Sequence, residues 1–157
     1  MTVQDNSIIK PTPSVELLAE KERKWRLVLP SDYKNFVMNY NGCIPDENAF
    51  ECDGHEYAVT RFLCILKSFE ESQYGDYDIS VVESEIGERL TDNEDLIGVE
   101  VLPIAELFAG DYACLDFREN KDKPTVCVWS HDNSEEFAPV TYKAADSFSE
   151  FIDMLKG

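Results

Sequence analysis

The chain has 157 residues, of which 43% are hydrophobic and 11% aromatic; this composition suits one folded domain and excludes a disordered chain. It carries 14 basic and 32 acidic residues, so its formal net charge is −18. A field of this sign repels nucleic acid and anionic membranes and favours encounter with a basic protein. We therefore expect an acidic, soluble domain whose partner is another protein.

The five cysteines indicate a reducing environment. Their number is odd and no pair has the Cys-x-x-Cys spacing, which argues against a disulfide framework and against a zinc site. Cys64, Cys114 and Cys127 lie inside apolar runs, where a free thiol behaves as a small hydrophobic side chain. The N-terminus has no apolar signal region, and no stretch approaches the length of a membrane span. We expect a cytoplasmic protein without a metal or a cofactor.

The chain divides into a short leader and one domain. Residues 1–13 end in Pro11-Thr12-Pro13 and are expected to form a flexible leader. Residues 14–157 contain no internal repeat and no low-complexity tract, so they predict a single domain.

Hydrophobic periodicity and capping residues predict four helices in this domain. Ser14, Ser31 and Ser147 stand at N-cap positions, while at the third helix Asp78 competes with a capping box of Ser80 and Glu83. Asn41-Gly42 is expected to end the second helix with a left-handed residue. The predicted helices run from Ser14 to about Lys24, from Asp32 to Tyr40, from Asp78 to Leu90 and from Ser147 to Leu155.

Strand patterns begin after the second helix. Hairpin-length connections separate the strands of the last third, which predicts antiparallel pairing. The order of elements predicts an α+β fold, with an N-terminal helix pair, a mainly antiparallel sheet and a C-terminal closing helix. The predicted strands are Ala49–Cys52, Tyr57–Leu66, Val99–Leu107, Tyr112–Arg118, Thr125–Ser130 and Phe137–Tyr142.

Most of the negative charge lies in the middle of the chain. Residues 44–100 contain 16 acidic and three basic residues, a net charge of −13. Within them, the connection from Phe69 to Asp78 places carboxylates beside aromatic rings, an arrangement typical of a binding hot spot for a basic protein. The alternative is a solvated loop whose tyrosines pack into the core. The candidate contact residues are Glu70, Glu71, Tyr74, Asp76, Tyr77 and Asp78.

Catalytic and metal sites have little support in the sequence. Cys43 or Cys52 could meet His55 across a hairpin, but no cysteine-protease signature accompanies them, so a surface histidine is the favoured interpretation. Asp92-Asn93-Glu94-Asp95 lacks the alternating ligands and the central glycine of a calcium loop, and we interpret it as a solvated turn. There is no phosphate-binding glycine loop and no basic patch.

Four segments in a fixed order carry a resemblance to a known family. They are Leu29 to Phe36 with Asn41-Gly42, Leu102 to Ala105 with Gly110 to Phe117, Val126 to Asp132, and Ala145 to Phe151. Together they resemble the SUKH superfamily, the Smi/Knr-type domains. The chain departs from the usual pattern at Cys43 and Ala109, where many members carry a further glycine.

The resemblance implies an α+β domain that acts by binding. The family consists largely of bacterial immunity proteins, which bind and neutralise polymorphic toxins of neighbouring cells, and enzymatic activity is not expected. The chain would then inhibit a cognate toxin through its acidic face, with a basic nuclease as the favoured class. The alternative is a regulatory scaffold of the cell-wall signalling type that binds cellular proteins, and a homodimer stays open. The matched residues are interpreted as fold determinants: Leu29, Pro30, Tyr33, Phe36, Gly42, Asp116 and Trp129.

Overall fold

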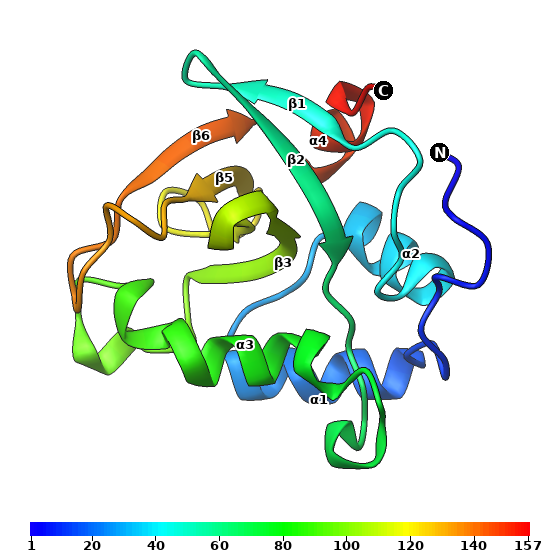
Figure 1. Cartoon of the computed structure of the whole chain (residues 1–157). Helices are drawn as coiled ribbons and strands as arrows, with labels where there is room; N and C mark the ends of the chain where they lie inside the picture. The colour runs from blue at the N-terminus through cyan, green and yellow to red at the C-terminus, as the bar shows by residue number, and fades with distance from the viewer.

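A six-stranded antiparallel sheet forms the centre of the computed structural model, which describes all of residues 1–157 (Figure 1). The strands follow one another in chain order across the sheet. They are β1 (Ala49–Cys52), β2 (His55–Phe62), β3 (Val101–Leu107), β4 (Tyr112–Asp116), β5 (Thr125–Trp129) and β6 (Thr141–Ala145). The sheet curls until its edges approach, since the Cys52 thiol of β1 donates to the Lys143 carbonyl of β6 at 3.4 Å.

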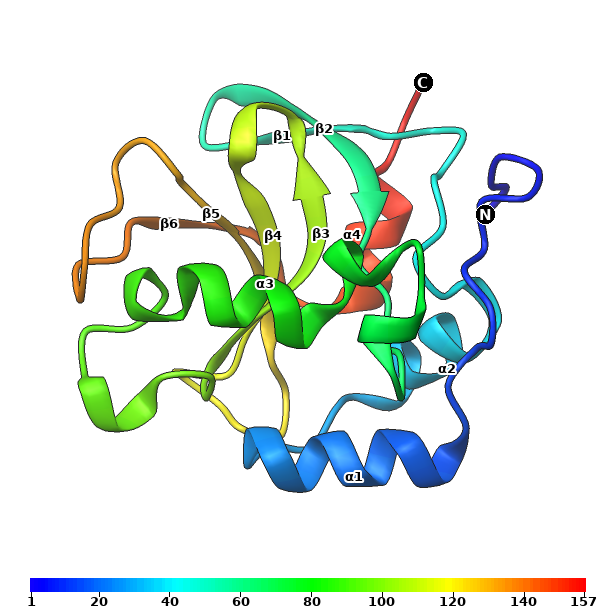
Figure 2. The same ribbon diagram turned by 60° about the horizontal axis from the view of Figure 1, so that its bottom comes forward.

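Four α-helices pack around this sheet, which confirms the predicted α+β class. In both views, α1 and α3 lie along one side of the sheet (Figures 1 and 2). The N-termini of α2 and α4 meet, because Asp32 Oδ2 accepts hydrogen bonds from the Ser149 N–H (3.0 Å) and hydroxyl (2.9 Å). The helices are α1 (Val15–Trp25), α2 (Ser31–Tyr40), α3 (Ile79–Ile86) and α4 (Phe148–Met154). None of them is both long and apolar enough to span a membrane.

Two of the predicted helix starts are confirmed, one needs correction, and at the third helix the structure decides between the two predicted caps. Ser14 and Ser147 cap α1 and α4 as expected. Ser31 is instead the first residue of α2 and makes no capping bond. Asp78 caps α3 and accepts from the Ser80 N–H at 2.8 Å, so the capping box of Ser80 and Glu83 does not form. The carboxylate at the N-cap already satisfies the free amide that the box would need.

The predicted second strand is too long at one end. It ends at Phe62, and the apolar run that follows is buried without a continuous ladder. The Leu63 N–H donates to the Ile104 carbonyl (2.8 Å), whereas the Ile65 N–H donates to the Asn41 side chain (2.8 Å). Only Leu63 still pairs with β3; from Cys64 to Leu66 the Tyr77 carbonyl and the side chains of Asn41 and Asp78 accept the backbone N–H groups in place of a neighbouring strand.

The last predicted strand is shifted along the chain. It was expected over residues 137–142, and β6 instead runs from Thr141 to Ala145. Phe137 has a left-handed backbone (φ 54°), which is incompatible with an extended strand. The predicted third helix also ends early, at Ile86, and a 3₁₀ turn continues from Gly87 to Arg89.

The predicted leader lies against the domain. The Gln4 N–H donates to the Ile44 carbonyl at 2.8 Å, and Val3 pairs with Pro45. Ile9 is 1% exposed and packs with buried neighbours from the segment after β2. Gly42 is left-handed (φ 65°) as expected, and a Cβ there would lie 2.4 Å from the Ile9 side chain. Residues 3–9 thus form part of the packed structure and are not a separate flexible segment.

Candidate partner-binding surface

The acidic loop, which we define as residues 69–78, leaves the domain after β2 and returns into α3. Two short 3₁₀ turns, Phe69–Glu71 and Gly75–Tyr77, shape it. Its base is fixed, because the Cys64 N–H donates to the Tyr77 carbonyl (2.8 Å) and the Ile79 N–H donates to the Cys64 carbonyl (2.9 Å). At Gly75 a side chain would collide with the Phe69 carbonyl at 2.3 Å, so a close backbone approach holds the two turns together. The loop therefore has a defined shape.

Arg61 connects the acidic loop to the rest of the domain. A shift in the strand register between Val59 and Arg61 interrupts β2, and such a bulge can redirect a side chain. The guanidinium donates to the Gly42 carbonyl and to the Ser7 carbonyl, both at 2.8 Å. Its carbon lies 5.2 Å from the Tyr74 ring centre and 4.9 Å from that of Tyr77. The Arg61 side chain thus contacts the N-terminal segment, the turn after α2 and the acidic loop.

Five of the six candidate contact residues separate into two groups. Glu70, Glu71 and Asp76 are exposed on the acidic loop, so their carboxylates can meet a partner. Tyr74 and Tyr77 are half-buried against Arg61, in the packing that we named as the alternative.

Asp78 is a correction to the predicted surface. It is 1% exposed, and its carboxylate accepts from the Leu66 N–H (2.8 Å) and the Ser80 N–H (2.8 Å). Burial raises its pKa, and these backbone hydrogen bonds oppose the rise. A carboxylate held inside the loop base in this way positions the loop and cannot contact a partner.

The predicted alternative of a cysteine nucleophile has unfavourable geometry. Cys52 and His55 face each other across the β1–β2 hairpin, yet the thiol donates to carbonyls of β6. Burial raises the pKa of Cys52 to about 11 and that of Cys43 to about 12. A nucleophilic cysteine needs the opposite shift, because the thiolate is the reactive form.

Metal-binding geometry is also absent from the structure. No three His, Cys, Asp or Glu side chains are grouped so that they could hold a metal ion. At residues 92–95, Asn93 caps a single 3₁₀ turn by accepting from the Asp95 N–H at 2.9 Å, and its neighbours are exposed. This is the arrangement of a solvated turn, as we interpreted it.

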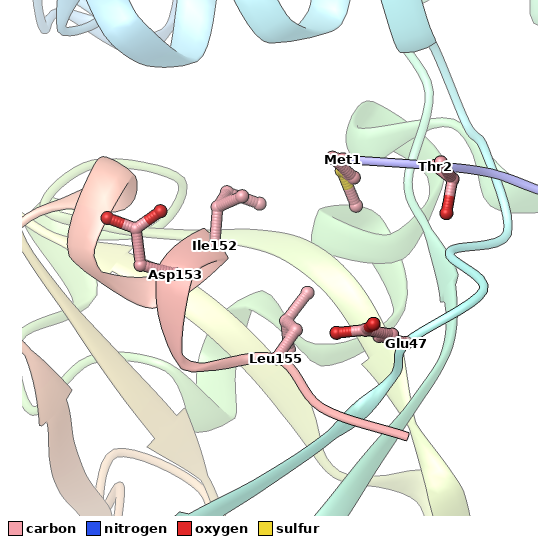
Figure 3. Close-up of a pocket in the computed structure, with 6 residues that line it drawn as sticks. All are labelled: Met1, Thr2, Glu47, Ile152, Asp153 and Leu155. Carbon is pink, nitrogen blue, oxygen red and sulfur yellow. The ribbon is translucent and has the colours of Figure 1, made fainter.

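A surface hollow of about 360 Å³ lies where the N-terminus, the segment before β1 and α4 meet (Figure 3). Its side chains include two carboxylates, Glu47 and Asp153, and the apolar Ile152 and Leu155. Figure 3 shows the Asp153 carboxylate pointing away from Glu47, so the two do not converge on a common point as a catalytic pair would.

Two surface features escaped the sequence reasoning. Arg61 had a visible signal, since it is the one arginine inside a largely apolar run, but its two carbonyl partners and two ring partners are distant in sequence. Phe108 had none: its neighbours predicted a hairpin turn, and only the structure shows that the ring is exposed.

In comparisons with known proteins, the sequence matches the model of one protein family. The SUKH_6 family, described as SMI1-KNR4 cell-wall, matches residues 15–152. The SPbeta prophage-derived uncharacterized protein YokK of Bacillus subtilis (strain 168) is 26% identical over 148 residues, which cover 87% of this chain and 71% of that protein. No solved structure gives a significant match.

Proposed function

Because the chain belongs to the SUKH (SMI1-KNR4) family, which includes immunity proteins, we propose that it is a non-catalytic immunity protein for a cognate toxin with a basic surface. The observation that carries the proposal is the acidic loop, whose base is fixed by Arg61 and Asp78 while Glu70, Glu71 and Asp76 stay exposed. Fixed carboxylates can bind cations without the entropic loss of ordering a mobile loop.

Charge provides the mechanism of recognition. A net charge of −18 accelerates encounter with a basic protein, and the effect decreases as salt is added. A nuclease is the favoured toxin class, because the groove that holds its phosphates is electropositive and a carboxylate-rich surface can occupy the same groove. Occlusion of that groove inhibits without any chemical step.

The thiols support an intracellular site of action. All five cysteines are free and buried. Cys114 and Cys127 are register partners in β4 and β5 and stay reduced. Unpaired thiols at facing positions are typical of a reducing compartment, which supports the proposal of a cytoplasmic immunity protein.

The test is a titration of toxin activity with the purified chain. The protein to be tested is the C-terminal domain of a large secreted protein, if a neighbouring gene encodes one, assayed on its own substrate. The proposal predicts that activity falls linearly to zero at one equivalent of the chain, and that the toxin recovered by dissociation at high salt is active and unchanged in mass.

Two results would contradict the proposal. Loss of activity at far less than one equivalent, or a covalent change in the toxin, would show catalysis by the chain. Binding to several cellular proteins, with the toxin fully active, would favour the scaffold alternative.

A further inference from the structure

Phe108 is the most unusual apolar side chain on the surface. It is 75% exposed, and it is the one aromatic residue among the large apolar side chains that are exposed. Every other phenylalanine is buried or half-buried. Single exposed apolar residues are common in proteins, but an isolated aromatic ring at a loop tip has the character of an interface anchor.

The turn between β3 and β4 holds this ring outward. Phe108 begins a single 3₁₀ turn that ends at Gly110, and the Leu107 N–H donates to the Asp111 carbonyl at 2.9 Å across it. Ala109 has a left-handed backbone (φ 68°), which costs a residue with a Cβ on the order of 1 kcal/mol. The sequence thus maintains a strained, closed turn directly beside an exposed ring.

A hollow of about 420 Å³ lies next to the ring, and we call it the Phe108 hollow. Its walls come from β2, from the β3–β4 turn, from the loop after β5 and from β6. Figure 2 shows the β1–β2 hairpin and the β3–β4 turn at the same edge of the molecule. Tyr57 and Tyr142 contribute half-buried aromatic surface, and Glu56 and Asp111 contribute carboxylates.

The charge of the Phe108 hollow is negative. No lysine or arginine is among the residues that line it. Burial raises the pKa of Tyr57, and the neighbouring Cys52 and Asp111 add to the rise. On the same hairpin Asp53 is exposed, which extends the negative surface. A second copy of this chain, with a net charge of −18, is repelled by such a surface, whereas a basic protein is attracted to it.

We propose that a basic partner protein binds at the Phe108 hollow. Phe108 inserts into an apolar site of the partner. A lysine or arginine of the partner enters the hollow toward Glu56 and Asp111. This inference rests on the proposed function. Both views place the acidic loop away from the β3–β4 turn (Figures 1 and 2), so the two surfaces have different roles. The exposed charges of the loop act on the association rate, and the Phe108 ring, once the partner covers it, acts on the dissociation rate.

The experiment measures binding kinetics of Phe108→Ala against the same purified toxin domain. Burial of an aromatic anchor predicts that this variant dissociates roughly tenfold faster or more, with its association rate and salt dependence unchanged. Val28→Ala is the matched control: Val28 is 68% exposed, and its truncation should leave both rates unchanged. Glu56→Gln should weaken affinity several-fold. The thermal midpoint of Phe108→Ala should stay within about 2 °C of the wild type, since the ring is exposed.

The outcomes separate the two proposals. If the wild-type chain binds the toxin domain and Phe108→Ala dissociates at the wild-type rate, the role of the hollow is overturned and the immunity proposal stands. If Val28→Ala loses as much affinity as Phe108→Ala, the effect is not specific to the hollow, and the inference is also overturned. If the wild-type chain does not bind the toxin domain, both proposals are overturned.

Discussion

The guanidinium carbon of Arg61 lies 4.9 Å from the centre of the Tyr77 ring, so the single base of β2 packs directly on the acidic loop. The same side chain donates to the carbonyls of Ser7 and Gly42. Its positive charge lies within a segment whose net charge is −13, and it joins the N-terminal segment, the turn after α2 and the acidic loop.

Arg61→Met should therefore destabilise the fold as a whole. The change leaves two carbonyls without their donor and removes the cation from two aromatic rings, so we expect a loss of about 2–4 kcal/mol in the free energy of unfolding, measured by urea denaturation. The control is Lys67→Met, which removes an exposed charge from the next segment and should cost little. Equal stabilities for the two variants would mean that Arg61 does not hold the loop.

Asp78 offers a test of how the loop base is built. Asp78→Ala removes the cap of α3 and the acceptor of the Leu66 N–H, so we expect a loss of about 2–3 kcal/mol in unfolding free energy. Asp78→Asn retains one acceptor oxygen and should lose less. Asp76→Ala changes an exposed carboxylate nearby and serves as the control. A thermal midpoint of Asp78→Ala equal to that of Asp76→Ala would refute the structural role.

The thiols should be inert in the folded protein. Burial raises the pKa of Cys43 and Cys64 to about 12 and that of Cys52 to about 11, and it also raises that of Cys114. At pH 8 only about one Cys52 in a thousand is then a thiolate. A thiol reagent should label none of the five cysteines in the native chain and all five in urea. Rapid labelling of a native cysteine would instead reveal a reactive thiol and reopen the question of catalysis.

Glu83 should make stability depend on pH. Burial raises its pKa from 4.5 to about 8, with Lys24 and Lys21 opposing the rise and Asp78 adding to it. The folded chain then holds a proton that the unfolded chain has released, so this contribution to stability declines as the pH rises from about 4.5 to about 8.

The comparison of Glu83→Gln with wild type isolates this effect. Urea denaturation between pH 5 and pH 8 should show that the variant gains stability relative to wild type as the pH increases, by at most about 1.4 kcal/mol per pH unit. The matched control is Glu85→Gln, an exposed carboxylate of the same helix, which should follow the wild-type curve. A constant difference between Glu83→Gln and wild type across this range would show that Glu83 is ionised in the fold.

Local patterns predicted the elements of the fold well, because capping and periodicity act over a few residues. Ser14 and Ser147 cap their helices, and Gly42 adopts the left-handed backbone that the Asn-Gly step predicts. The errors arise where contacts with residues distant in sequence determine the local backbone structure. The run after Phe62 has the composition of a strand, but the Asn41 side chain binds its backbone in place of a neighbouring strand.

The candidate surface was predictable only in part for the same reason. Charge density identified the acidic loop, and Glu70, Glu71 and Asp76 are exposed on it. Charge density gives no information on burial, so Asp78 was grouped with them although it belongs to the loop base. The exposure of Phe108 follows from the closed turn between β3 and β4, which an apolar ring within a strand-like pattern does not reveal.

The association rate constant of the chain with the toxin domain, measured at low and high salt, tests whether the acidic loop contacts the toxin. Glu70→Lys combined with Glu71→Lys reverses two carboxylates on the acidic loop, and the control, Glu16→Lys with Glu20→Lys, makes the same change in net charge on exposed positions of α1. If the acidic loop steers binding, the loop variant associates at least about tenfold more slowly than wild type at low salt, the control is much less affected, and the difference shrinks at high salt. Equal rates for the loop variant and the wild type at low salt would contradict a role of the acidic loop in binding.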